Sequence, residues 1–163
     1  GEDPVCLYLE TTNRCNLLCT TCPRTYEELE PPSDMSWELF TSIVDQFPKI
    51  ERVVLHGVGE PMMVAGLPNM VRYLKERGVY VLFNTNGTLM REKKCRELIE
   101  AGLVRKVICT AARGHSKEPS PFERLWMEGK IELECVPQGT FAERIRAGGA
   151  VRKRSMCNDG GGR

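Results

Sequence analysis

The sequence lacks any long apolar run, and it lacks a surplus of charge of either sign. No segment of its 163 residues approaches the roughly 20 consecutive apolar residues that a membrane-spanning helix needs. The first residues, Gly1-Glu2-Asp3-Pro4, carry neither the basic nor the apolar region of a signal peptide. The formal net charge is only +1, which gives no electrostatic reason to expect nucleic acid or a membrane as a partner. We therefore expect a cytoplasmic globular protein.

A fourth clustered cysteine is also missing. Of the eight cysteines, only Cys15, Cys19 and Cys22 lie close together. A disulfide scaffold pairs an even number of cysteines, and a closed structural zinc site has four protein ligands. Three thiolates on one loop instead suit an iron-sulfur cubane whose fourth iron stays open for a substrate or cofactor. The scattered cysteines are interpreted as small buried hydrophobes or incidental surface thiols: Cys6, Cys95, Cys109, Cys135 and Cys157.

Strand and helix patterns alternate along the first two thirds of the chain. Short apolar runs predict four strands, at 5–9, 52–55, 79–83 and 104–109. Apolar residues at helical spacing predict three intervening helices, at about 37–47, 67–77 and 91–101. Ser36 and Thr88 are the candidate N-caps of the first and third helix.

This alternation predicts parallel strands joined by right-handed helical crossovers. The expected fold class is therefore α/β, a partial (βα) barrel of about three βα units plus a fourth strand. A short irregular C-terminal segment is expected to follow. Loops after parallel strands share one edge of the sheet, so the loops 13–23, 56–61 and 84–87 are expected to meet there.

Two of these loops have a simpler interpretation as turns. The Gly57-Val58-Gly59-Glu60-Pro61 run permits either a tight turn or the close approach of a ligand to the backbone. Asn84-Thr85-Asn86-Gly87 is likewise a good turn whose side chains can also bind a polar ligand. His56 is interpreted as a structural histidine, with a ligand or a proton donor as the alternative.

Cys15-x-x-x-Cys19-x-x-Cys22 resembles the signature of the radical S-adenosylmethionine (SAM) enzymes. The resemblance continues into Leu9 to Arg14, into the glycine run at the place of that family's Gly-Gly-Glu motif, and into Asn84 to Thr88. In order and spacing, residues from about 5 to 112 resemble the first half of the family's barrel. Thr21 departs from the pattern, because many members carry an aromatic residue there, and so does Cys109-Thr110-Ala111, where the family often reads Ser-Leu-Asp.

The resemblance implies a [4Fe-4S] cluster held by the three cysteines, with SAM chelating the fourth iron. In such a site the reduced cluster cleaves SAM to methionine and a 5'-deoxyadenosyl radical, which abstracts hydrogen from a substrate that is unknown here. A flavodoxin- or ferredoxin-type electron donor is the implied partner. The implied SAM-binding residues are Gly57, Gly59 and Glu60 at the methionine end, and Asn84 and Asn86 farther along.

The pattern changes after Ala112. Residues 113–128 are polar and linker-like, and 151–163 form a basic, Gly-rich tail that we predict to be disordered. Residues 129–150 resemble a fragment of the α-type subunit of 3-oxoacid CoA-transferases, with an alternating strand, a Pro-Gln-Gly-Thr turn and a helix. The expected organisation is therefore a truncated radical SAM partial barrel at 1–112 followed by these three segments.

Two alternatives to a radical SAM enzyme stay open. The first is a truncated chimera that binds an iron-sulfur cluster but is catalytically inactive. The second is a CoA-transferase subunit fragment, although the acyl-transfer glutamate of that family belongs to a segment that this sequence does not contain.

Overall fold

The computed structural model describes residues 4–27, 30–90, 92–109, 118–119, 121–137, 139–140 and 143–144. The chain divides into two compact units, Gly1–Val104 and Arg105–Arg163. Within the described ranges, no helix combines the length and the apolar character that crossing a membrane requires. Each unit is described separately below.

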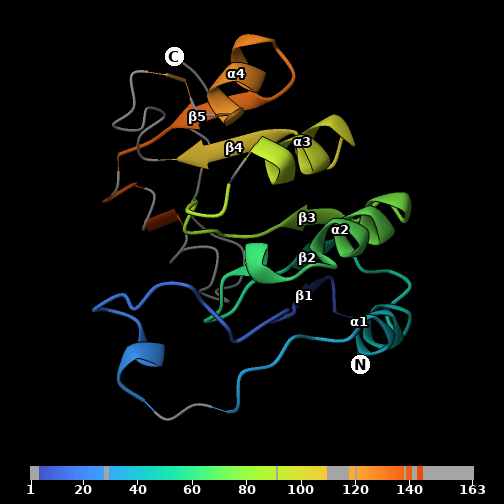
Figure 1. Cartoon of the computed structure of the whole chain (residues 1–163). Coiled ribbons are helices and arrows are strands. Elements are labelled where there is room, and N and C mark those ends of the chain that lie inside the picture. The colour runs from blue at the N-terminus through green and yellow to red at the C-terminus, as the bar shows by residue number, and fades with distance from the viewer. Residues whose placement is uncertain are drawn as a thin grey trace, which may run out of the picture. The chain divides into compact units, whose positions relative to one another are not determined.

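A three-stranded parallel sheet forms the centre of the first unit (Figure 1). Strand β2 (Arg52–Val54) lies between β1 (Cys6–Tyr8) and β3 (Tyr80–Leu82), and both pairs are parallel. The parallel α/β arrangement predicted for the first three strands is therefore confirmed. Each strand is shorter than the apolar run that predicted it.

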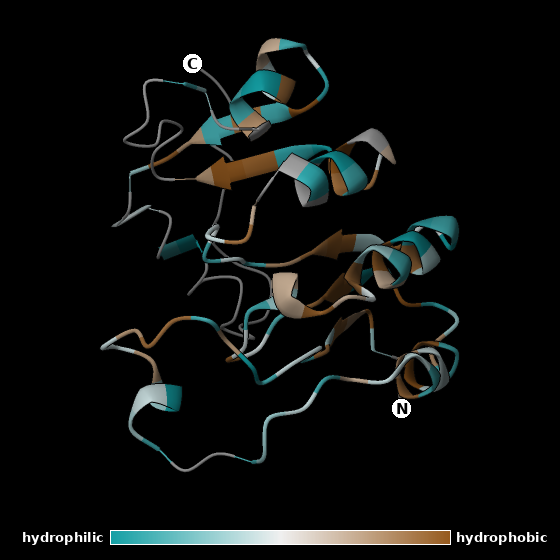
Figure 2. Cartoon of the chain, viewed as in Figure 1, coloured by the Kyte–Doolittle hydropathy of each residue, from teal (hydrophilic) through white to brown (hydrophobic). Residues whose placement is uncertain are grey.

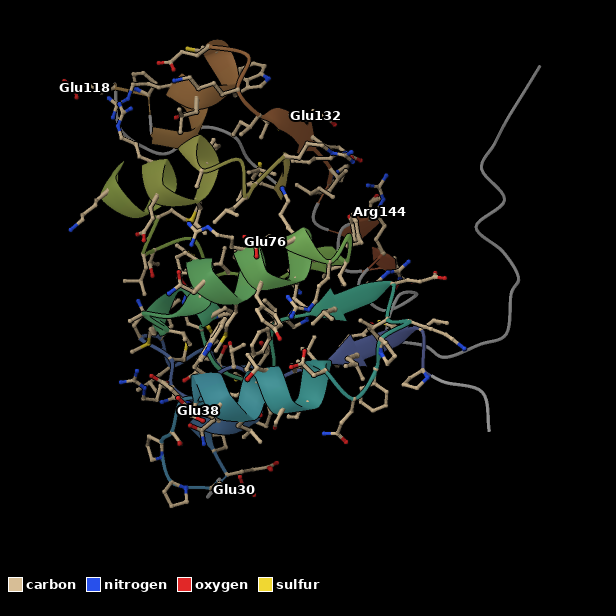
Figure 3. The ribbon with its side chains drawn as sticks, turned by 90° about the vertical axis from the view of Figure 1, so that its right-hand side faces the viewer. Glu30, Glu38, Glu76, Glu118, Glu132 and Arg144 are labelled. Carbon is tan, nitrogen blue, oxygen red and sulfur yellow. The ribbon has the colours of Figure 1, made fainter. Side chains whose placement is uncertain are left out.

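Three helices accompany this sheet: α1 (Trp37–Val44), α2 (Leu67–Glu76) and α3 (Glu92–Glu100). Leu7, Val53 and Val81 are in register across the strands, so their side chains share one face. That face packs against apolar residues of the helices, which are Phe40, Val44, Leu67, Met70, Val71, Leu74 and Leu98. Figure 2 shows the hydrophobic colour concentrated in β2 and β3 and hydrophilic positions along α2. The exposed carboxylates Glu38 and Glu76, labelled in Figure 3, lie on α1 and α2.

The two predicted N-caps have different outcomes. Ser36 caps α1 as predicted, because its side chain accepts a hydrogen bond from the backbone N–H of Leu39 at 3.1 Å. Thr88 does not cap α3, which begins at Glu92. Its hydroxyl instead donates to Oδ1 of Asn86 at 2.7 Å, so Thr88 belongs to the preceding loop.

The second unit contains β4 (Lys106–Cys109), α4 (Pro121–Met127) and β5 (Glu132–Cys135). Within this unit β4 pairs in parallel with β5. The partial barrel in which β4 is the fourth strand stays a prediction. Helix α4 lies in the segment 113–128 that was expected to be linker-like, and it contains Leu125, which is only 2% exposed. Strand β5 matches the alternating strand predicted after Gly129.

A group of ion pairs lies on one face of the β4–β5 sheet. Lys106 contacts the carboxylate of Glu134 at 2.5 Å, and Arg144, labelled in Figure 3, donates to the same carboxylate. The hydrogen bonds from Lys106 and then Arg144 lower the pKa of Glu134 to about 2. The predicted tail 151–163, with Cys157, and Thr110 and Ala111 after β4 lie outside the described residues.

Candidate functional site

Three loops meet at the carboxyl edge of the first sheet. The cysteine loop (13–23) follows β1, the glycine loop (56–61) follows β2 and the asparagine loop (84–88) follows β3. Because the strands are parallel, all three loops leave the same edge. Hydrogen bonds join each loop to another, so the structure brings the three loops together.

Glu60 is the buried residue that joins the loops. Only 2% of it is exposed, and its carboxylate accepts hydrogen bonds from Met62 N at 2.9 Å, Thr85 Oγ1 at 2.7 Å and Asn86 N at 2.7 Å. Its own backbone N–H donates to the carbonyl of Arg14 at 2.8 Å. A buried carboxylate needs such donors to offset its lost hydration. Glu60 therefore connects the glycine loop to the asparagine loop through its side chain and to the cysteine loop through its backbone.

The two glycines of the glycine loop are packed closely against the chain that leaves β1. A Cβ atom on Gly57 would lie 2.2 Å from Oε1 of Glu10, which also accepts a hydrogen bond from Val58 N at 2.6 Å. A Cβ atom on Gly59 would lie 2.0 Å from the carbonyl oxygen of Thr12. Gly59 thus requires glycine because the obstructing atom is backbone, whereas at Gly57 the obstructing atoms belong to the Glu10 side chain. The sequence pattern alone did not reveal this packing.

Side-chain amides join the asparagine loop to the cysteine loop. Asn86 Nδ2 donates one hydrogen bond to Asn16 Oδ1 at 3.0 Å and another to Cys15 Sγ at 3.8 Å. Asn16 Nδ2 donates in turn to Thr88 Oγ1 at 2.7 Å. The side-chain amide of Asn86 therefore lies beside both Asn16 and the sulfur of Cys15 in the cysteine loop.

The three clustered cysteines are reduced thiols on a loop with its own internal bonds. Cys19 is exposed, Cys15 and Cys22 are half-buried, and none of them forms a disulfide. The carbonyl of Cys19 accepts hydrogen bonds from Cys22 N at 3.1 Å and from Thr25 Oγ1 at 2.7 Å. Among the residues that the structure describes, no three His, Cys, Asp or Glu side chains gather closely enough to hold a single metal ion.

Asp34 supports the cysteine loop from outside the predicted motifs. Its Oδ1 accepts hydrogen bonds from Thr12 Oγ1 at 2.7 Å and from Arg14 Nε at 2.8 Å. The hydrogen bond from Arg14 lowers the pKa of this carboxyl group more than any other contact does. Sequence reasoning missed this residue because no local pattern indicates that position 34 returns beside position 12.

Asn84 lies on the side of the site that faces His56, and not beside the cysteines. Its backbone N–H donates to Nδ1 of His56 at 3.2 Å, and the imidazole ring contacts Tyr8 edge-on with the centroids 6.5 Å apart. Burial lowers the pKa of His56 below its ordinary value of 6.5.

We expect His56 to make the stability of the chain depend on pH. The unfolded chain takes up a proton at His56 at a higher pH than the folded chain does, because the folded pKa is the lower one. The contribution of His56 to the free energy of unfolding is complete above pH 6.5 and is lost as the pH falls through the pKa of the folded state. The urea midpoint should therefore decrease between about pH 8 and about pH 5, and decrease less in His56→Gln. His115→Gln, which changes the only other histidine of the sequence, is the matched control; an equal pH dependence in His56→Gln and the wild type would contradict the prediction.

A family model matches the part of the chain that carries these loops. The family model described as the Radical SAM superfamily matches residues 9–155. The tungsten-containing aldehyde ferredoxin oxidoreductase cofactor-modifying protein of Pyrococcus furiosus is 40% identical over 100 residues, which cover 60% of this chain and 28% of that protein. The chain spans less than a third of the length of the first curated relatives that it matches.

A solved structure and a second kind of relative complete the comparison. The crystal structure of BtrN in complex with AdoMet and 2-DOIA matches with a TM-score of 0.61 and 20% identity, covering 83% of this chain and 57% of that one, which indicates a shared fold. One of the 3-oxoadipate CoA-transferase subunits of Pseudomonas putida is 33% identical over 115 residues, 71% of this chain and 48% of that protein. Both resemblances predicted from the sequence therefore have counterparts among known proteins.

Proposed function

Because this chain belongs to the radical SAM superfamily, we propose that Cys15, Cys19 and Cys22 bind a [4Fe-4S] cluster and that the adjoining loops bind SAM. When bound, this pair of groups supplies the family's chemistry, the reductive cleavage of SAM. The observation that carries the proposal is the contact of all three loops at one sheet edge, with reduced thiols on the first of them.

The donor set suits a cubane cluster better than a single ion. Each thiolate of a cubane ligates a different iron atom, so the three sulfurs stand farther apart than the ligands of one ion do. The cysteine loop is partly exposed and carries three thiols that form no disulfide. In the described residues no three ligands gather closely around one point, which is consistent with that requirement.

The residues of the site have separate tasks in this proposal. Gly57, Gly59 and Glu60 remain the proposed residues for the methionine end of SAM, and Asn84 and Asn86 those for its polar groups farther along. Glu60 in addition holds the asparagine loop by accepting bonds from Thr85 and Asn86, so it orients the residues around the cofactor as well.

An electron donor of the flavodoxin or ferredoxin type is the proposed partner. The cysteine loop is accessible to such a protein, because Leu18, beside Cys19, is 74% exposed and Leu17 is 37% exposed. An exposed apolar residue at a cluster loop suits a transient docking contact. The substrate class is left open.

One observation favours the alternative of an inactive iron-sulfur chimera. In the described residues β4 pairs with β5 within the second unit, whereas the three loops follow the strands of the first unit. The match to a CoA-transferase subunit points the same way. Under this alternative the cluster forms but SAM is not cleaved.

Anaerobic reconstitution followed by a cleavage assay distinguishes the two. With iron, sulfide, SAM and dithionite present, we expect release of 5'-deoxyadenosine and methionine, and none when dithionite is omitted. A chain that assembles the cluster without releasing 5'-deoxyadenosine would support the inactive chimera. Acyl-CoA exchange after addition of a complementary CoA-transferase subunit tests the remaining alternative, and we expect none.

A further inference from the structure

Two cysteines of the second unit lie side by side, far along the sequence from the cluster loop. Strands β4 and β5 run parallel to each other (Figure 1). Their register pairs Cys109 with Cys135. Residues paired in this way have side chains on the same face of the sheet. Each cysteine is the last residue of its strand, so both thiols lie at the carboxyl end of the pair.

The spacing of paired strands is suited to a covalent bond between these residues. Neighbouring strands lie about 4.8 Å apart, and the Cα atoms of a disulfide are usually about 4.4–6.8 Å apart. Cys135 is exposed and Cys109 is half-buried, and both are thiols in this structure. A small oxidant therefore has access to at least one sulfur of the pair.

Interactions on the opposite face keep the register fixed. Lys106 on β4 bonds to Glu134 on β5, and Val136 N donates to the carbonyl of Cys109 at 3.0 Å immediately beyond the pair. A slip of one residue would move every side chain to the other face and lose these contacts. The register thus keeps the two cysteines opposite each other on neighbouring strands.

We propose that Cys109 and Cys135 are a redox-active pair that forms a reversible disulfide by exchange with a low-molecular-weight disulfide such as oxidised glutathione. The thiolate of exposed Cys135 attacks one sulfur of the oxidant, which forms a mixed disulfide and releases one glutathione thiolate. The thiolate of Cys109 then displaces the second glutathione. The two cysteines lose two protons and two electrons, and oxidised glutathione is reduced to two molecules of glutathione. The pair acts independently of the proposed cluster site.

Peptide mapping of the full chain tests this pairing. The variant Cys15→Ala/Cys19→Ala/Cys22→Ala removes the cluster thiols from competition, and the sample is incubated with oxidised glutathione, alkylated and digested with trypsin. Cleavage after Lys106, Arg113, Lys130 and Arg144 gives peptides 107–113 and 131–144, each with one cysteine of the pair. We expect these two peptides to be joined with the loss of two hydrogen atoms, and to separate on reduction with dithiothreitol.

Two further variants make the result decisive. Cys135→Ser should abolish the joined peptides and leave Cys109 alkylated or glutathionylated, whereas Cys95→Ser should leave the joined peptides unchanged. Peptides 107–113 and 131–144 found only as separate glutathione adducts, or joined to the peptide of Cys157 as often as to each other, would overturn the proposal. Retention of the far-UV circular dichroism spectrum shows that the variants remain folded.

Discussion

Replacing Cys19 with alanine is expected to reduce the iron bound after anaerobic reconstitution from about four atoms per chain to background. The side chain is exposed, and the turn around it is held by backbone atoms, since the carbonyl of Cys19 accepts the bonds from Cys22 N and Thr25 Oγ1. Alanine keeps that carbonyl and removes only the sulfur. A loss of bound iron would therefore result from the missing sulfur ligand and not from a change in the fold of the loop.

The matched control is Cys6→Ala. Cys6 is a half-buried thiol on β1 of the same unit, outside the cysteine loop, and its isolated place in the sequence indicates an incidental cysteine. We expect this variant to retain the wild-type iron and sulfide content and the visible absorption of the cluster. Equal iron in the wild type and in a variant that lacks all three loop cysteines would refute the cluster.

Sequence periodicity predicted the order of the helices and strands in the first unit. It predicted only some of the pairings between strands. Parallel β1, β2 and β3 were predicted because each is separated from the next by an amphipathic helix, which restricts the connection. The apolar run 104–109 has the same local pattern as they do, yet β4 pairs with β5. Strand pairing depends on contacts between distant residues, and periodicity carries no information on them.

The residues of the site likewise include some that the sequence predicted and some that it did not. Chemistry and spacing marked Cys15, Cys19 and Cys22, and the shared edge of a parallel sheet brought the glycine and asparagine loops to them. The supporting contacts were not predictable, because Asp34 meets Thr12 and Glu10 meets Gly57 across long stretches of chain. Thr88 was likewise predicted to cap a helix, but its hydroxyl accepts a hydrogen bond from Asn16 of the distant cysteine loop and donates to Asn86.

Gly59→Ala is expected to destabilise the chain by about 2–4 kcal/mol, because the new methyl group has no space. The Cβ atom would lie 2.0 Å from the carbonyl oxygen of Thr12 and 2.8 Å from that of Arg14. Both are backbone atoms, so the contact is relieved only by moving the chain that leaves β1. That movement also displaces the Arg14 carbonyl from the backbone N–H of Glu60 and shifts the cysteine loop. We therefore expect reduced iron incorporation as well as reduced stability.

Two other glycines of the same unit provide a graded comparison by urea unfolding. At Gly57 the obstructing atoms belong to the flexible side chain of Glu10, which can swing away at the loss of its bond to Val58, so about 1–2 kcal/mol is expected for Gly57→Ala. At Gly66 a Cβ atom meets nothing within 4 Å and φ is −81°, so Gly66→Ala should change stability by no more than about 0.5 kcal/mol. The expected order of destabilisation is Gly59, then Gly57, then Gly66. A Gly59→Ala variant as stable as Gly66→Ala would show that the glycine loop does not pack against the chain leaving β1, and that the cysteine loop is held in place by other contacts.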